Sequence, residues 1–462
     1  MGIPSYFSYI IRKYPNIIRK ECGQVQLLMM DCNSIIYDAY HDLQEEYKKS
    51  QFDLSLLEDR IIKMTIRRIC DYILLIKPDK LAYVTFDGVA PMAKMDQQRE
   101  RRYKSAFFGS NNDIWNTANI TPGTPFMKKL SAEVTQYFSV KHSHLLNINI
   151  RTSCSDEPGE GEHKLFQYIR DNDCKEDVVA VYGLDADLII LSILHIHKTK
   201  EIYVFREAPN FKTVISVEEE IIKMGIKDLY EGIYKEMVCC REESDKENRV
   251  KDYIFLTFFL GNDFLPHMAS LNIRRNGMEI LMETYKKEIG KELIVKSGEI
   301  EWKNVERLIK RMAEREEKEM KRETTERGKK ILNKRSSEEL WLNMPMIYRM
   351  DEIYINAGEE GWEERYYRRV HGKEKKENIS KKYIEGLEWC QKYYSEGCIN
   401  WEWRYGYSGA PLLRDIKCEK VCIRDGSKSR SESEQLEYVM PKGEEREMSW
   451  EYKRYNWESK VK

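Results

Sequence analysis

The stretch VVAVYGLDADL, residues 178–188, decides how the chain folds. Its run of β-branched and other apolar residues predicts a buried strand, and two aspartates follow at the C-terminal end of that strand. Apolar segments of the same kind recur along the first half of the chain, separated by stretches with helical periodicity. These segments are QLLMMDC at 26–32, LAYVTFDG at 81–88 and EIYVFRE at 201–207. The alternation predicts an α/β fold with a mostly parallel central sheet flanked by helices.

Seven acids in five clusters lie within or beside apolar sequence. They are Asp31, Asp87, Glu160, Glu162, Asp185, Asp187 and Asp263. A single acid next to an apolar run is usually a helix cap or a turn residue. Three of these acids, however, follow three different predicted strands, and the carboxyl ends of strands in an open α/β sheet meet at the edge that binds ligands. The sequence therefore predicts that the carboxylates converge.

Converging carboxylates would repel one another and raise each other's pKa unless a cation neutralised them. Hard divalent ions with oxygen ligands, Mg²⁺ or Mn²⁺, are the natural occupants, and the number of acids suits two ions. Two metal ions about 3.5–4 Å apart stabilise the attacking and leaving oxygens of a phosphoryl transfer. We therefore predict a site with two Mg²⁺ or Mn²⁺ ions and with water as the nucleophile. His163 is a further potential ligand, with a structural role as the alternative.

A basic segment follows Asp87 directly, in APMAKMDQQRERRYKSA at 90–106. The residues with the spacing of one helical face are Lys94, Gln98, Arg101 and Arg102. On its own such a segment is typical of a solvated helix. After a strand that ends in a metal-binding aspartate, however, it would place phosphate-binding groups beside the metal ions, and arginine forks suit a terminal phosphate.

The composition excludes several classes of protein. Of the 462 residues, 41% are hydrophobic, which argues against a disordered or fibrous chain. The 77 basic and 78 acidic residues nearly cancel, so the net charge decides nothing about nucleic acid. No apolar run approaches the ~18–20 residues of a membrane span, and no Walker motif indicates a nucleotide cofactor. The 11 cysteines without a CxxC pair, and the lack of a secretory signal, favour reduced thiols in the cytoplasm or nucleus.

The second half of the chain has a different character. Residues 303–337 begin with apolar residues at helical spacing and then become almost wholly charged, which favours a solvated helix or linker over a basic nucleic-acid arm. From Trp341 onward the chain contains seven of its nine tryptophans. After Asp415 the sequence turns polar, which is typical of a poorly ordered tail or a segment lying over the surface.

Several motifs resemble, in this order, the XRN family of 5′→3′ exoribonucleases. They are MGIPSYFSYIIRKYP at 1–15, LMMDCNSII at 28–36, TFDGVAPMAKMDQQRERR at 85–102, NITPGTPFM at 119–127, PGEGEHK at 158–164, YGLDADL at 182–188, FFLGNDFLPHMASLNIR at 258–274 and YIEGLEWCQKYYSEGCINWEWRYGYSGAP at 383–411. The resemblance implies a PIN-like or flap-nuclease-like core and a helical, aromatic-rich conserved region that packs on it. It also implies that the seven acids bind metal, and that the basic face binds a 5′-monophosphate through Lys94, Gln98, Arg101 and Arg102.

With this resemblance the chain divides into four predicted parts. They are a nuclease core at 1–290, a charged helical connector at 291–340, an aromatic-rich second region at 341–415 and a polar tail at 416–462. The resemblance also concerns base stacking. In family members with a motif like DxNGIIH, the histidine of this motif stacks on a base. Tyr37 occupies the position of that histidine in this chain, and tyrosine can also stack on a base. Its predicted partner is Trp401 or Trp403, with a core role for these tryptophans as the alternative.

The predicted function is metal-dependent 5′→3′ hydrolysis of single-stranded RNA that carries a 5′-monophosphate, with processive release of nucleoside 5′-monophosphates. Neither a membrane nor a nucleotide cofactor is expected to take part. Two alternatives remain open. One is a structure-specific 5′ flap-type DNA nuclease, which shares an acid cluster but usually has a helical arch in place of a phosphate pocket. The other is an RNA-binding protein whose catalytic site has decayed.

Overall fold

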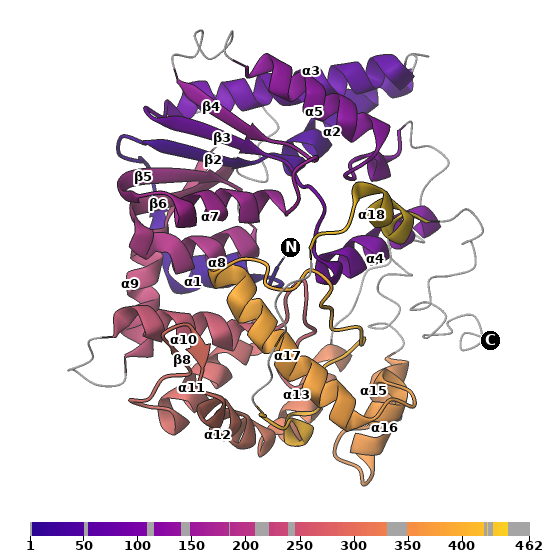
Figure 1. Cartoon of the computed structure of the whole chain (residues 1–462). Helices are drawn as coiled ribbons and strands as arrows, with labels where there is room; N and C mark the ends of the chain where they lie inside the picture. The colour runs from indigo at the N-terminus through magenta and orange to yellow at the C-terminus, as the bar shows by residue number, and fades with distance from the viewer. Residues whose placement is uncertain are drawn as a thin grey trace. The chain divides into compact units, whose positions relative to one another are not determined.

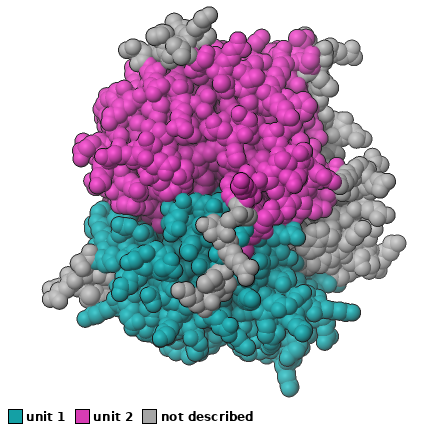
Figure 2. Space-filling view, viewed as in Figure 1, with its two compact units in different colours: residues 1–14, 230–400, 404–426 teal, residues 15–229, 401–403, 427–462 magenta. Residues whose placement is uncertain are grey.

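The computed structural model shows a chain that divides into two compact units (Figure 2). Unit 1 comprises Met1–Tyr14, Tyr230–Asn400 and Arg404–Gly426, and unit 2 comprises Pro15–Leu229, Trp401–Trp403 and Ser427–Lys462. The structure describes residues 2–49, 54–108, 115–139, 148–183, 185–207, 221–238, 245–329, 349–419, 423 and 428–441. The division into four parts stays a prediction.

Unit 2 is built on one sheet, which within the described residues has seven strands in the order β1-β7-β6-β5-β2-β3-β4. The strands are β1 (Ile18–Arg19), β2 (Leu27–Asp31), β3 (Leu81–Thr85), β4 (Asn149–Ser153), β5 (Cys174–Tyr182), β6 (Thr199–Glu207) and β7 (Ile221–Gly225). Neighbouring strands from β6 to β4 run parallel, whereas β7 pairs antiparallel with both β6 and β1. Strands β2 and β3 are buried along almost their whole length, because both of their faces are covered. The predicted mostly parallel α/β sheet is confirmed.

Helices flank this sheet on both faces (Figure 1). Helices α2 (Asn33–Lys49), α3 (Leu54–Ile76) and α5 (Pro125–Tyr137) lie on one face, and α7 (Gly161–Asp171) and α8 (Ala186–His195) lie on the other. The first group buries apolar side chains together with those of β2 and β3 in one core cluster. This part of the chain also contains short 3₁₀ turns and helix α9, which continues into unit 1: η1 (Pro15–Ile17), η2 (Thr117–Asn119), η3 (Ile196–Lys198) and α9 (Ile226–Met237).

Helix α4 (Met92–Phe108) follows β3 and packs against a helix from the far C-terminal part of the chain, α18 (Glu432–Val439). Ser431 and Glu434 begin α18 with a capping box, in which the side chain of each accepts a hydrogen bond from the backbone N–H of the other. Val439 joins the apolar side chains at the start of α4. The segment expected to be a polar tail thus contains a helix that packs on α4. Hydrophobic periodicity does not predict this helix, because its sequence is mostly polar.

Unit 1 is predominantly helical. Its described elements are α1 (Tyr6–Lys13), α10 (Lys246–Phe258), η4 (Ile273–Arg275), α11 (Gly277–Glu288), β8 (Val295–Lys296), β9 (Glu299–Ile300), α12 (Trp302–Ala313), α13 (Glu316–Gly328), α15 (Met350–Ile355), α16 (Trp362–Val370), α17 (Lys376–Ser395) and η5 (Leu413–Asp415). Aromatic rings fill its interior: the ring centroid of Phe264 lies 4.9 Å from that of Trp389, which stacks on Tyr393 at 4.5 Å. The predicted helical, aromatic-rich region is confirmed.

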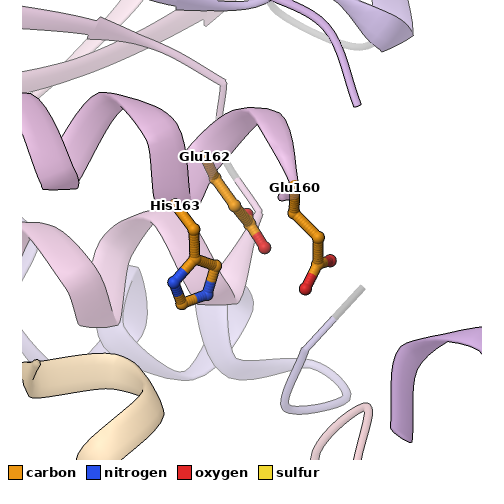
Figure 3. Close-up of side chains that lie close together, drawn as sticks. All are labelled: Glu160, Glu162 and His163. Atoms are coloured by element: carbon orange, nitrogen blue, oxygen red, sulfur yellow. The ribbon is translucent and has the colours of Figure 1, made fainter. Parts of the chain in front are cut away.

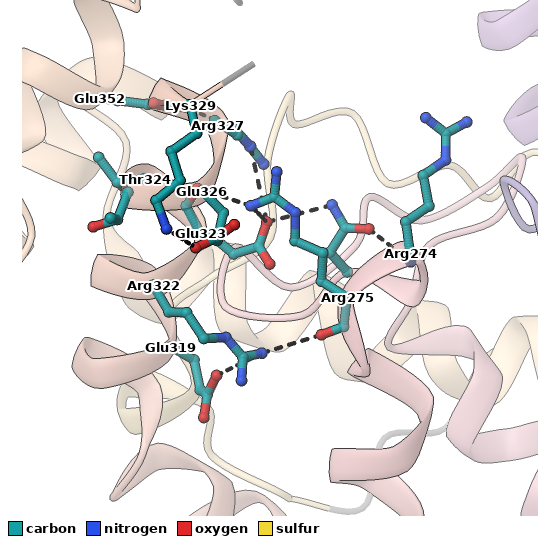
Figure 4. A network of polar contacts seen from close by, with 12 residues as sticks. Arg274, Arg275, Glu319, Arg322, Glu323, Thr324, Glu326, Arg327, Lys329 and Glu352 are labelled. Carbon is teal, nitrogen blue, oxygen red and sulfur yellow. Dashed lines mark hydrogen bonds and ion pairs between the residues drawn. The ribbon is translucent and has the colours of Figure 1, made fainter.

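Helix α13 lies in the charged stretch that was expected to be a solvated helix or linker. In the structure this stretch is helical, but one face of the helix is buried. The helix buries Glu316, Glu319 and Glu323. Figure 4 shows the arginines that neutralise two of them: Arg322 lies 2.8 Å from Glu319, and Arg275 of η4 lies 3.3 Å from Glu323. Each of these two carboxylates has a guanidinium partner, which makes its burial tolerable. The sequence did not predict the buried face of α13, because charged residues and not apolar ones recur there at helical spacing.

Glu316, the first residue of α13, makes the stability of the chain depend on pH. Its Oε1 accepts a hydrogen bond from Leu413 N at 2.7 Å, and burial raises the pKa of this carboxyl to about 7. The unfolded chain, with a Glu pKa of about 4.3, releases this proton first, so stability falls as pH rises from about 4 to 7. Glu316→Gln keeps an oxygen for Leu413 N without a buried charge. We expect its free energy of unfolding to exceed that of the wild type by about 1–3 kcal/mol at pH 8, and to match it near pH 4.

Urea unfolding at both pH values checks this expectation. Glu314→Gln is the matched control, because Glu314 is exposed on the same segment and the substitution removes the same charge. An equal pH dependence in Glu316→Gln and the wild type would contradict the assignment.

Two further features of the described residues are the lengths of the apolar helical stretches and the state of the cysteines. Among the described residues, no helix has an apolar stretch that is long enough to cross a membrane. The cysteines that the structure describes are free thiols: Cys22, Cys32, Cys70, Cys154, Cys174, Cys390, Cys398 and Cys418.

Candidate active site

Three aspartates of unit 2 lie where neighbouring parallel strands end. Asp31 is the last residue of β2, Asp87 follows β3, and Asp185 precedes α8 beyond the end of β5. Strand β2 pairs with both β3 and β5, and Asp31 lies opposite Thr85. The structure thus brings these three acids to the carboxyl edge of the sheet, where α/β folds bind ligands.

The start of α7 adds two glutamates and a histidine to this edge. Glu160 is the N-cap residue of α7, and Glu162 and His163 lie in its first turn. All three are buried, and their ligand atoms lie within 4.8 Å of one another. Figure 3 shows the three side chains directed to the same side of the helix. Asp187, in the first turn of α8, is buried and acts on the pKa of Glu162, so it belongs to the same cluster.

Gly161, between the two glutamates, lies directly against two of the aspartates. Its N–H donates to Asp87 Oδ1 at 2.7 Å, and a Cβ at this position would lie 2.5 Å from Asp31 Oδ1. Asn33 Nδ2 donates to the other oxygen of Asp87, Oδ2, at 2.5 Å. These contacts fix the start of α7 beside the ends of β2 and β3. Glycine fits here because the Cβ of any other residue would push the Asp31 side chain away.

The crowded carboxylates hold protons more tightly than isolated ones. Burial, together with repulsion from Asp87 and Asp185, raises the pKa of Asp31 to about 8. Burial and the neighbouring Asp187 raise the pKa of Glu162 well above its usual range. Within the described residues, Asp31 Oδ1 is buried and receives no hydrogen bond. A buried carboxylate oxygen without a donor is costly unless a cation faces it.

This set of donors fits a divalent metal ion. Carboxylate oxygens are the ligands that Mg²⁺ and Mn²⁺ prefer, and a bound cation removes the repulsion that raises the carboxyl pKa values. Burial, followed by the charges of Arg170 and Lys94, lowers the pKa of His163 well below its usual range, so its imidazole is neutral and able to coordinate a metal. Lys94 Nζ lies 2.5 Å from Glu160 Oε2 and supplies one positive charge. The buried acidic cluster therefore indicates divalent metal binding.

Helix α4 carries the four residues predicted to bind a phosphate. Lys94 forms an ion pair with the acidic cluster, Gln98 is buried, and Arg101 is exposed. Arg102 is held by Thr121, whose Oγ1 accepts hydrogen bonds from Nε at 3.0 Å and from Nη2 at 2.7 Å. Burial lowers the pKa of Arg102, which nevertheless stays a cation because a guanidinium is not deprotonated in proteins. Their role in binding phosphate stays a prediction.

The residues predicted to stack on bases differ in exposure. Tyr37 is 38% exposed. Partial burial raises the pKa of its hydroxyl, whereas the positive charges of Arg102 and Arg101 lower this pKa. Tyr37 therefore lies near the basic face of α4. Trp401 is half-buried, and its carbonyl oxygen accepts a hydrogen bond at 2.8 Å from the first N–H of α4. Trp403 is only 5% exposed. The exposure favours Tyr37 and Trp401 over Trp403, and stacking by any of them stays a prediction.

Asp263 lies in unit 1, in the turn that follows α10. Asn262 shapes this turn, because its Oδ1 accepts hydrogen bonds from Phe264 N at 2.9 Å and from Leu265 N at 2.8 Å. The other six predicted acids all lie in unit 2. Convergence of Asp263 with them therefore stays a prediction.

Three residues that hold the predicted site side chains, or the backbone next to them, carry no signal in the sequence that marks this role. Asn33 and Thr121 hold Asp87 and Arg102, respectively. Lys164 is buried, and its Nζ donates hydrogen bonds at 2.9 and 2.7 Å to two carbonyl oxygens beyond the ends of β3 and β4. All three lie inside the motifs MMDCNS, NITPGTPFM and PGEGEHK. The motifs therefore contain these three residues, but no spacing rule distinguishes a residue that holds a predicted site side chain from its neighbours.

Two family models match the chain. The model described as "XRN 5'-3' exonuclease N-terminus" matches residues 1–113 and 108–208. The model described as "Xrn1 helical domain" matches residues 243–356 and 348–455. Together the two models cover most of the sequence.

Curated relatives carry the name 5'-3' exoribonuclease. The 5'-3' exoribonuclease 2 of Arabidopsis thaliana is 25% identical, over 92% of this chain and 59% of its own length. The 5'-3' exoribonuclease 2 homolog of Drosophila melanogaster is 26% identical, over 96% of this chain and 64% of its own length. The 5'-3' exoribonuclease 2 of Eremothecium gossypii is 29% identical, over 72% of this chain and 44% of its own length. The chain thus spans between 44% and 64% of the length of these relatives.

Among solved structures, the catalytic core of Rad2 in complex with a DNA substrate is similar over 76% of this chain and 86% of that chain. The sequence identity is 15% and the TM-score is 0.38, which is too low to establish a shared fold.

Proposed function

Because the chain belongs to the XRN family of 5'-3' exonucleases, we propose that it degrades RNA from the 5′ end as an exoribonuclease. Its proposed substrate is single-stranded RNA with a 5′-monophosphate, and its products are nucleoside 5′-monophosphates released processively. The observation that carries this proposal is the ion pair of Lys94 with Glu160, at 2.5 Å, because it joins a basic helix face directly to the buried acidic cluster.

The acids would hold two Mg²⁺ or Mn²⁺ ions over which the scissile phosphate lies. Such ions, when bound, stabilise the attacking and leaving oxygens and lower the pKa of a nucleophilic water. The part played by the chain is to keep the ligand oxygens in place. Asp87 is oriented by Asn33 and by the N–H of Gly161, while Asp31 is fixed by its position at the end of a central strand. This preorganisation means that no carboxylate has to move during the reaction.

The basic face of α4 would bind the 5′-phosphate of the first nucleotide. Arg102 is fixed by Thr121, and Arg101 is exposed to an incoming RNA end. Tyr37 and Trp401 would stack on bases. Each cut leaves a new 5′-monophosphate, so the next cycle meets the same end group, whereas a 5′ triphosphate or a cap would be too large for a closed pocket. We also propose that the protein acts in the cytoplasm or nucleus, where cysteines stay reduced.

The proposed function is tested with Mg²⁺ and one single-stranded sequence made as RNA and as DNA, with a 5′-phosphate, 5′-hydroxyl or 5′-triphosphate end. We expect rapid release of nucleoside 5′-monophosphates from the 5′-phosphorylated RNA alone. A DNA duplex with a 5′ flap is tested in parallel, and faster cleavage of this duplex than of the RNA would favour the flap-nuclease alternative. Binding of RNA without cleavage would favour an RNA-binding protein with a decayed site.

Gly161→Ala is expected to disrupt the acidic cluster without a change of charge. The added Cβ meets Asp31 Oδ1 at 2.5 Å and Thr85 Oγ1 at 3.2 Å, so the aspartate must leave its position. We expect at least a tenfold lower rate of nucleotide release, because a carboxylate displaced by about 1 Å can cost 10²-fold in rate. Thermal unfolding with and without Mn²⁺ should also show a smaller stabilisation by the metal than in the wild type.

Gly23→Ala is the control for this variant, since a Cβ at Gly23 meets nothing within 4 Å. Wild-type activity and wild-type metal stabilisation in Gly161→Ala would show that the described approach of α7 to β2 is wrong.

A further inference from the structure

Gln435, on the C-terminal helix α18, links the backbone beyond β3 to the basic face of α4. It is fully buried, and its Oε1 accepts a hydrogen bond from Ala90 N at 3.0 Å. Its Nε2 donates a hydrogen bond to Gln98 Oε1 at 3.3 Å. Gln98, also buried, is one of the four side chains proposed to bind the 5′-phosphate. The C-terminal helix therefore reaches the proposed pocket through the side chain of Gln435.

The chemistry of these two hydrogen bonds determines which way both amides point. A backbone N–H can only donate, so Gln435 must turn its oxygen toward Ala90. The NH₂ group of Gln435 then faces Gln98, which must present its own oxygen in return. Gln98 thereby has its NH₂ group left to donate to a further partner. Phosphate oxygens accept hydrogen bonds, so this orientation of Gln98 suits a phosphate, whereas the reversed amide would present an oxygen and repel it.

We infer that Gln435 is a positioning residue for the 5′-phosphate: it sets the amide orientation of Gln98 and thereby the preference for 5′-phosphate over 5′-hydroxyl ends. This inference rests on the proposed function of α4 and adds to it a residue from the end of the chain. Gln435 acts through Gln98 and does not contact the phosphate itself. Its loss should therefore affect discrimination between the two ends more than the overall affinity for RNA.

Other contacts hold α18 on α4 without taking part in this pair of amides. Tyr438 donates a hydrogen bond to Asp96, and the guanidinium of Arg99 lies 5.0 Å from the centroid of the Tyr438 ring. Val439 is fully buried in an apolar cluster with Met92 and its neighbours. Val439→Ala therefore weakens the docking of α18 but leaves both amide hydrogen bonds in place, which makes it a matched control.

The test compares the full-length wild type with Gln435→Met, Gln98→Ala, the double variant and Val439→Ala. Methionine keeps the length of glutamine but cannot replace its donor and acceptor. Fluorescence anisotropy gives the dissociation constants of one short RNA with a 5′-phosphate and with a 5′-hydroxyl, in EDTA so that nothing is cleaved. The ratio of the two constants measures the 5′-phosphate preference. Thermal unfolding verifies that each variant is folded, and release of nucleotides with Mg²⁺ is measured in parallel.

We expect Gln435→Met to lower the 5′-phosphate preference by about 3- to 10-fold, the effect of one neutral hydrogen bond. Gln98→Ala should lower it at least as much, and Gln435→Met should add no further loss in the double variant, because both changes remove the same interaction. Val439→Ala should keep the wild-type preference. An unchanged preference in Gln435→Met, losses that multiply in the double variant, or an equal loss in Val439→Ala would each overturn the inference.

Failure of the proposed function would produce a different pattern. If the wild type preferred 5′-phosphate in binding but released no nucleotides with Mg²⁺, the exonuclease proposal would fail, and the binding data would still decide the role of Gln435. If the wild type showed no preference in binding, both the phosphate pocket and the role of Gln435 would be overturned.

Discussion

Asp185→Ala is expected to lower the rate of nucleotide release by more than about 100-fold. Loss of a residue that only supports a metal ligand costs about 10–100-fold in affinity or activity, and loss of a ligand should cost more. The folded state should not suffer, because Asp185 is one of the charges that repel Asp31 and raise its pKa. Thermal unfolding in EDTA should therefore occur at the same temperature as in the wild type, or at a higher one.

Single-turnover rates on 5′-phosphorylated RNA, and isothermal titration with Mn²⁺, measure this effect. Asp171→Asn is the control, since it removes an exposed acid from the far end of α7. Wild-type rates and wild-type Mn²⁺ binding in Asp185→Ala would rule out the metal site as placed at the ends of β2, β3 and β5.

Arg101→Ala is expected to remove most of the preference for a 5′-phosphate while leaving the chemical step intact. The side chain is exposed at the basic face of α4, and hydrogen bonds to charged groups contribute about 1.5–3 kcal/mol. The ratio of kcat/KM for 5′-phosphate over 5′-hydroxyl RNA should therefore fall by about 10- to 100-fold. The loss should appear on the 5′-phosphorylated RNA, while the rate on the 5′-hydroxyl RNA stays near that of the wild type.

Arg67→Ala provides the control for net charge, because Arg67 is exposed on α3, away from the basic face of α4. An equal loss on both RNA ends in Arg101→Ala would show that Arg101 contributes to general RNA attraction and not to a pocket for the phosphate.

The sheet and most of the acidic cluster follow from the sequence for a simple reason. Buried parallel strands are apolar along their length, so an acid at the end of such a run is conspicuous. Asp31, Asp87 and Asp185 were predicted to meet because parallel strands share a carboxyl edge, and the structure places them there. The approach of α7 could not be derived in this way, because it depends on the absence of a side chain at Gly161.

Buried pairs of polar residues cannot be recognised from apolar patterns in the sequence. Helix α13 buries glutamates against arginines, and helix α18 buries Gln435 against another glutamine. Hydrophobic periodicity responds to apolar residues only, so both segments read as solvated or as a tail. Arg275, the partner of Glu323, and Gln98, the partner of Gln435, lie far away in the sequence, so only the tertiary structure shows these two pairs.

An RNA labelled at both ends reveals from which end the chain degrades its substrate. The substrate carries ³²P in its 5′-phosphate and a fluorophore at its 3′ end, and both labels are followed with time in Mg²⁺. If the chain is a 5′→3′ exoribonuclease, ³²P appears first and entirely as a nucleoside 5′-monophosphate, while the fluorophore stays on long RNA until the end. Early fluorescent mononucleotides, or shortened oligonucleotides that still carry the 5′-³²P, would contradict degradation from the 5′ end.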